Sequence, residues 1–165
     1  MIGRYLPGDR HLHLNDDFMK QLIFKTNNSI APLFLRIFLA LVLFPHGAQK
    51  LFGWFGGYGF AGTMDYFSNT KGIPWILGFL VIVIEFFGPI ALLLGAATRL
   101  WSIAICIVMT GIILTTFSQY FFMNWFGVQK TEGAEYFLLA IGMSLSLAMS
   151  GAGRYSVDTS VMTPK

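Results

Sequence analysis

Charge and cysteine are both scarce in this sequence, and each shortage excludes a class of protein. Only 12% of the 165 residues are charged, whereas an average soluble domain carries about a quarter. Cys106 is the one cysteine, so neither an intramolecular disulfide nor a CxxC pair for dithiol exchange can form. What remains is apolar: 55% of the residues are hydrophobic and the mean hydropathy is +0.64. This is the composition of a membrane protein.

Four apolar stretches are long enough to cross a bilayer as helices. A spanning helix needs about 20 residues to cover ~30 Å of hydrocarbon at about 1.5 Å per residue. The stretch "WILGFLVIVIEFFGPIALLLG" has one charge and no polar face, unlike a helix of a soluble bundle. We therefore predict an all-α fold, a four-helix integral membrane bundle. The predicted spans are residues 30–52, 73–97, 100–122 and 133–152.

The flanking charges predict the orientation. An even number of spans leaves both termini on one side, and near the spans that side has five basic residues against two on the other. The positive-inside rule then places both termini in the cytoplasm. The same basic excess explains a pI near 9.1 without a nucleic-acid partner. The five residues are Lys20, Lys25, Arg99, Arg154 and Lys165, and the two are Lys71 and Lys130.

The segments outside the spans divide the chain into three parts. Residues 1–29 form a cytoplasmic extension, residues 30–158 the membrane domain and residues 159–165 a cytoplasmic tail. Within the extension, "NDDFMKQLIFK" predicts a short amphipathic helix with Asn15 as its N-cap. We expect this helix to lie on membrane lipids or to pack against a partner subunit.

A polar stretch, "FPHGAQKLFGWFGGYG", interrupts the end of the first span. His46 and Lys50 project from one helix face because they lie four residues apart, and Glu135 enters the fourth span at the same level. We predict that these three side chains converge near the outer end of the bundle. They would suit a quinone, with His46 as proton donor, Lys50 as electrostatic stabiliser of the reduced oxygen and Glu135 as its counter-ion.

The aromatic residues that follow extend this hypothesis. Trp54, Phe55 and Tyr58 would form the wall of a slot for the quinone ring. A structural alternative stays open: Lys50 could extend to the headgroups and meet Glu135 there, while His46 only packs. The aromatic side chains would then form an interfacial belt.

Two more charges lie inside predicted spans, where an ionisable side chain costs roughly 2.5–3.5 kcal/mol at the bilayer centre. Counting about 1.5 Å per residue from the span ends places Arg36 and Glu85 at similar depth on sequential helices. We therefore predict an Arg36–Glu85 pair. It would fix the register of the two helices, or it would set a proton-handling carboxylate beside the bound quinone.

Motifs for other cofactors are missing. Haem inside a membrane usually takes paired histidines, and only His46 lies in a span. No GxGxxG lies between a strand and a helix, and no HExxH or cysteine cluster suggests a metal. We expect no haem, flavin or metal on this chain, so any electron transfer would need a partner's redox centre or the quinone itself.

Three stretches form a combination that is specific as a whole: "LRIFLALVLFPHGAQKLFGWFGGYG", "EFFGPIALLLGAATRLWS" and "GAEYFLLAIGMSLSLAMSGAGRYSVD". Through them the chain resembles the DoxX family of small four-helix bacterial membrane proteins over most of residues 33–158. The resemblance implies a respiratory-type setting, since DoxD relatives are associated with thiosulfate:quinone oxidoreduction and other members with membrane-bound oxidoreductase complexes. The positions that match the family's pattern are Arg36, His46, Lys50, Glu85, Arg99, Glu135, Arg154, Ser156 and Asp158.

The last of these stretches, "SGAGRYSVD", predicts a helix that ends at glycine. Asp158 would pair with Arg154 or with Arg99, as a structural connection on the cytoplasmic side.

Two functional classes follow from these observations. The first is an integral membrane subunit of a quinone-linked redox or respiratory system, with the quinone near the outer ends of spans one and four. The alternative is a non-catalytic accessory subunit that stabilises a larger respiratory or photosynthetic complex. Expected partners are lipids and other membrane subunits or further copies of the chain. A transporter is disfavoured because no inverted repeat or broken central helix is visible.

Overall fold

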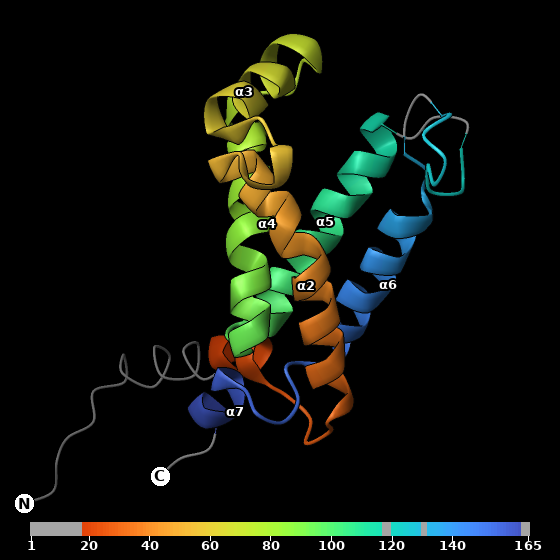
Figure 1. Ribbon diagram of the computed structural model, residues 1–165. Helices are drawn as coiled ribbons and strands as arrows, with labels where there is room; N and C mark the ends of the chain where they lie inside the picture. Colours follow the sequence, from red (N-terminus) through yellow and green to blue (C-terminus); the bar gives the residue numbers. More distant parts are fainter. Residues whose placement is uncertain (1–17, 117–119, 130–131, 163–165) are drawn as a thin grey trace, which may run out of the picture.

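The computed structural model describes residues 18–116, 120–129 and 132–162, and all regular secondary structure in these ranges is helical. Four helices pack into a bundle (Figure 1), which confirms the predicted all-α membrane fold. Apolar side chains from all four form one core that includes Leu39, Leu92, Ile105 and Leu147. The four helices are α2 (Ala31–Phe52), α4 (Trp75–Leu94), α5 (Thr98–Thr116) and α6 (Glu135–Ser150).

Three of these helices, α2, α4 and α5, are long and apolar enough to cross a membrane by length and composition. Helix α6 is a shorter apolar helix of 16 residues, or about 24 Å at about 1.5 Å per residue. The third predicted span does not continue as a helix to residue 122, since residues 120–122 are not helical. Instead, the backbone N–H groups of Ala134 and Glu135 donate to the carbonyls of Tyr120 and Phe121.

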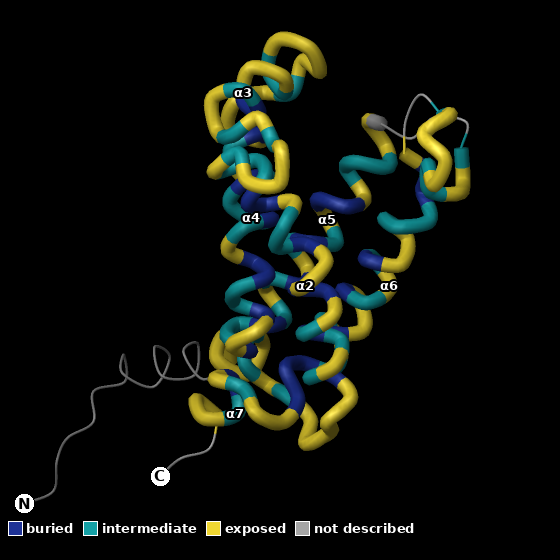
Figure 2. Tube along the Cα trace, viewed as in Figure 1, coloured by how far each residue is buried: buried dark blue, intermediate teal, exposed yellow. Residues whose placement is uncertain are grey.

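The surface of the bundle is apolar where it would face lipid. Figure 2 shows buried residues between the helices and exposed ones on their outer faces. Large apolar side chains such as Phe34, Leu41 and Ile107 are exposed there. In water such a surface would be a liability, but hydrocarbon is as apolar as these side chains.

The two ends of the bundle differ. Residues 18–24 are helical and lie near α7 (Val157–Met162) at one end, here called the terminal end (Figure 1). The helical turns that follow α2 and the segment 120–129 lie at the opposite end, the loop end. Having both terminal segments at one end agrees with an even number of spans. Asn15, the predicted cap of the N-terminal helix, lies outside the described residues.

At the loop end the chain folds into short helices where the sequence indicated a loop. After Gly53, three helical pieces lead back to α4; the first packs against α2, and the other two pack against α4. The rings of Phe60 and Trp75 contact the ring of Phe79, with centroids 6.4 and 5.4 Å away. The three pieces are η1 (Trp54–Gly56), α3 (Gly59–Asp65) and η2 (Tyr66–Thr70), the last a π-helical turn.

Candidate functional site

The close approach of α2 and α4 depends on Gly47. A Cβ atom at this position would lie 2.3 Å from the backbone oxygen of Glu85 and 2.6 Å from the Cα atom of Phe86. Those distances are far inside van der Waals contact, so only glycine allows the two backbones to touch here. The contact fixes the register of the antiparallel pair and sets the next turn of α2 beside Glu85.

Lys50 and Glu85 form an ion pair at this contact. The Nζ atom of Lys50 donates to the Oε2 atom of Glu85 and lies 3.5 Å from the backbone oxygen of His46. The Glu85 side chain is only 2% exposed, while that of Lys50 is 24% exposed. A buried carboxylate needs such a partner because its desolvation is otherwise uncompensated. The pair therefore explains why a lysine follows His46 by one helical turn.

The predicted Arg36–Glu85 pair is wrong. In the antiparallel register fixed by Gly47, Glu85 lies opposite the stretch from Gly47 to Lys50, whereas Arg36 lies opposite the last turn of α4. Ten residues separate Arg36 from His46, which is about 15 Å along the helix at about 1.5 Å per residue. The prediction assumed that the ends of the two apolar stretches lie at the same depth in the membrane, but these ends are not aligned with each other.

Arg36 instead binds backbone carbonyls at the C-terminal end of α4 and in the segment that follows α6. Its buried guanidinium donates to five backbone carbonyls, and the last four carbonyls of a helix have no partner within the helix. All three nitrogen atoms of the guanidinium take part, and the acceptors of its hydrogen bonds are backbone carbonyls rather than a carboxylate. The acceptors are Leu92 and Leu93 at the end of α4, and Ala152, Arg154 and Tyr155 after α6, at 2.7–3.4 Å.

Glu135 does not complete the predicted cluster with His46 and Lys50. Its carboxylate accepts a hydrogen bond from the backbone N–H of Met123 at 3.3 Å, and so it ties α6 to the loop segment before it. Lys50 has Glu85 as its carboxylate partner. The counter-ion that the sequence assigned to Glu135 is therefore supplied by α4.

His46 faces α6 through Tyr136, the residue after Glu135. The centroids of the two rings lie 5.7 Å apart. The Tyr136 hydroxyl is buried and has no hydrogen-bond partner among the described residues. The structure thus brings together His46, Lys50, Glu85 and Tyr136 towards the loop end, and this group is called the polar cluster below.

The predicted aromatic wall is dispersed. The ring of Trp54 contacts that of Phe52 at 5.2 Å, and Phe52 in turn contacts Phe86 next to Glu85. Phe55 and Tyr58 are 66% and 84% exposed. Tyr58 lines a separate hollow beside α3, together with Gly62, Asp65, Tyr66 and Thr70. These three aromatic residues therefore do not enclose one slot beside His46.

Asp158 is held by backbone rather than by arginine, which corrects the expected pairing with Arg154 or Arg99. Its carboxylate accepts from the backbone N–H groups of Ala97 and Thr98 at 2.7 and 2.9 Å. It therefore caps the N-terminus of α5, where a negative charge is favourable. Arg99 donates to the backbone oxygens of Lys25 and Met149.

Two residues of the site, Gly47 and Tyr136, were not predicted from the sequence. Gly47 is a glycine inside an apolar helix, which signals a close backbone approach, and it could have been used to set the register. Tyr136 gave no signal, because tyrosine is abundant near the ends of spans. The described residues contain no group of three or more His, Cys, Asp or Glu side chains that could hold a metal.

The fold and composition define an integral membrane protein built from a helical bundle. The family model of DoxX matches residues 31–119, more than half of the chain, so the chain belongs to the DoxX family. It is also similar to a Bacillus subtilis (strain 168) protein named "Putative oxidoreductase CatD". The two are 26% identical over 136 residues, which is 82% of this chain and 90% of CatD. No solved structure matches the chain.

Proposed function

We propose that the chain is a membrane subunit of a quinone-linked redox system, and that it holds the quinone at the polar cluster between the loop ends of α2 and α6. One observation carries this proposal. His46 lies beside Tyr136, whose buried hydroxyl has no partner among the described residues, and both are close to the ion pair of Lys50 with the buried Glu85. The similarity to a protein named as an oxidoreductase supports the redox setting.

The residues of the cluster fit the needs of a quinone. A bound quinone would supply two-electron redox chemistry, with electrons from a partner oxidoreductase. His46 is exposed on α2 and would donate or accept a proton when the quinone is reduced or the quinol oxidised. Lys50 would place a positive charge next to a ring oxygen, where negative charge develops on reduction, and Glu85 would hold Lys50 in place through their ion pair. Glu135 would act indirectly, by holding the loop segment that precedes α6.

We further propose that the chain lies in a bacterial inner membrane with both termini on the cytoplasmic side. The terminal end of the bundle carries Lys20, Lys25, Arg99 and Arg154, which is the basic side expected in the cytoplasm. The polar cluster would then exchange protons with the opposite, outer side of the membrane.

The experiment is to purify the chain in mild detergent and to measure extracted quinone per chain by mass spectrometry, for the wild type and for His46→Ala and Lys50→Ala. We expect quinone near one per chain in the wild type and a several-fold loss in both variants, with folding of His46→Ala intact. Tyr155→Phe, an exposed residue at the terminal end, is the control. Wild-type protein without quinone would contradict the proposal.

An accessory subunit is the second candidate, and the helical segment 18–24 favours it. Phe18, Met19 and Leu22 are exposed on this segment, and they offer an apolar surface to a partner subunit or to lipid. Residues 25–27 hydrogen-bond to the bundle, so the segment is held in place. If the chain is a scaffold, Phe18→Ser combined with Leu22→Ser would release co-purifying subunits, while His46→Ala would not.

A further inference from the structure

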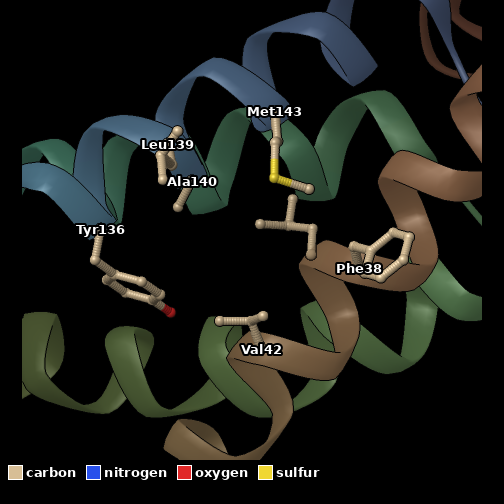
Figure 3. A pocket seen from close by; sticks show the side chains of 7 residues that line it. Phe38, Val42, Tyr136, Leu139, Ala140 and Met143 are labelled. Atoms are coloured by element: carbon tan, nitrogen blue, oxygen red, sulfur yellow. The ribbon is translucent and has the colours of Figure 1, made fainter.

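An apolar cleft lies between α2 and α6, and Tyr136 of the polar cluster lines it (Figure 3). Its volume is about 140 Å³. An apolar protein cavity of about 150 Å³ is large enough to hold benzene, so this cleft can take a ring or a short branched hydrocarbon. The lining residues are Phe38, Leu39, Val42, Tyr136, Leu139, Ala140 and Met143.

The cleft opens sideways from the bundle. Leu39 and Ala140 form its buried floor, at 2% and 4% exposure, while Val42 and Leu139 at its edges are 45% and 66% exposed. Leu39 and Val42 lie in the middle of α2, and Leu139 and Ala140 lie in the second turn of α6. In a bilayer this opening faces hydrocarbon, so the molecule that fills it must itself dissolve in the membrane.

One polar atom marks the cleft, and it is the hydroxyl of Tyr136. Figure 3 shows the Tyr136 side chain reaching from α6 with its oxygen directed towards Val42 of α2. Among the described residues this buried oxygen has no hydrogen-bond partner. A buried hydroxyl without a partner costs about 1–3 kcal/mol, so the site favours an occupant that brings a hydrogen-bond acceptor.

We propose that the cleft between α2 and α6 is the lateral entrance for a prenylated quinone, with Tyr136 donating a hydrogen bond to a ring oxygen and the first part of the prenyl tail lying against Val42 and Met143. This inference rests on the proposed function, and it adds the route of entry and a binding residue. A tail-bearing molecule with an acceptor oxygen at one end satisfies both the apolar walls and the single hydroxyl. A phospholipid also has an acceptor oxygen, in its acyl ester, next to an apolar tail, so the experiment distinguishes a bound quinone from a bound phospholipid.

The test compares tailed and tail-less quinones. The purified full chain is titrated in lipid nanodiscs with a benzoquinone and a naphthoquinone, each with and without a short prenyl tail. Val42→Phe fills the cleft, and Leu41→Phe is the matched control because Leu41 is the next residue on α2, is also exposed, and does not line the cleft. If Val42→Phe fails to fold, Leu139→Phe fills the same cleft from its other exposed edge.

We expect Val42→Phe to weaken binding of the tailed quinones at least about tenfold, as overpacking of a filled site commonly does. Tail-less rings should lose less affinity than tailed ones, and Leu41→Phe should change neither. Tyr136→Phe, which removes only the hydroxyl, should weaken tailed and tail-less quinones alike by about five- to tenfold.

The outcomes separate this inference from the proposed function. If the wild type binds quinone and Val42→Phe binds tailed quinone equally well, the lateral entrance is refuted and the quinone site stands. If the wild type binds no quinone, the proposed function fails as well. If native mass spectra show that Val42→Phe loses a phospholipid and no quinone, the cleft is a lipid site and the inference is overturned.

Discussion

The buried Lys50–Glu85 pair predicts that the two partners are not equally important for stability. The Glu85 side chain is 2% exposed and that of Lys50 is 24% exposed. Removing Lys50 leaves a carboxylate with almost no access to solvent. Removing Glu85 leaves an ammonium group near the end of α2, from which a flexible lysine can extend to the interface.

The expected magnitudes follow from this asymmetry. Breaking a buried ion pair by removal of one partner costs about 3–5 kcal/mol, and Lys50→Met should cost about 3 kcal/mol at the low end of that range. Glu85→Gln should cost about 1.5 kcal/mol, in the range of a hydrogen bond to a charged group. Replacing both by apolar residues, Lys50→Met with Glu85→Leu, should be close to neutral, because neither charge is then left unpaired.

Thermal unfolding in mild detergent measures these differences, and the four tryptophans provide a fluorescence signal. At about 2–4 °C per kcal/mol for a chain of this size, Lys50→Met should lower the Tm by roughly 6–12 °C. Lys71→Met, at an exposed lysine of the loop end, is the matched control and should change little. The reasoning is refuted if Lys50→Met behaves like Lys71→Met, or if the double variant is less stable than Lys50→Met.

Two further predictions concern the packing of α2. Gly47→Ala should destabilise the protein by about 1–3 kcal/mol and also weaken quinone retention, because the new methyl group would overlap the backbone of Glu85. The control is Gly111→Ala, which should be neutral or slightly stabilising because nothing lies within 4 Å of a Cβ atom at that position. Equal Tm values for the two variants would contradict the close approach. Arg36→Lys should strongly destabilise the protein, since an ammonium group cannot donate to five carbonyls with the geometry of a guanidinium. Arg154→Lys, at an exposed position, is the control and should leave the Tm nearly unchanged. Equal Tm values for the two variants would contradict this role of Arg36.

The helices were predictable from the sequence because each apolar stretch is long and its ends are marked by glycine or polar residues. Gly53 and Gly95, both at positive φ, end α2 and α4 close to where the hydropathy falls. The register between helices was not predictable in this way. It depends on a backbone contact at Gly47, and an apolar pattern alone carries no information about which turn of α2 faces which turn of α4.

The missing information on helix register also explains why the predicted quinone site was only partly correct. Proximity of His46 and Lys50 follows from their spacing on one helix, which sequence reveals. The choice between Glu85 and Glu135 as partner of Lys50 depends on how three helices pack, and the structure assigns it to Glu85. Tyr136 entered the site only because α6 packs with its first turn facing His46.

Photo-labelling tests the central claim most directly. An azido derivative of a prenylated quinone would be irradiated with the purified chain in nanodiscs, and labelled peptides identified by mass spectrometry. We expect saturable labelling, competed by unlabelled quinone, on peptides from residues 38–52 of α2 and 135–143 of α6. Labelling confined to the exposed segment 54–72, or labelling that unlabelled quinone does not reduce, would contradict a quinone site at the polar cluster.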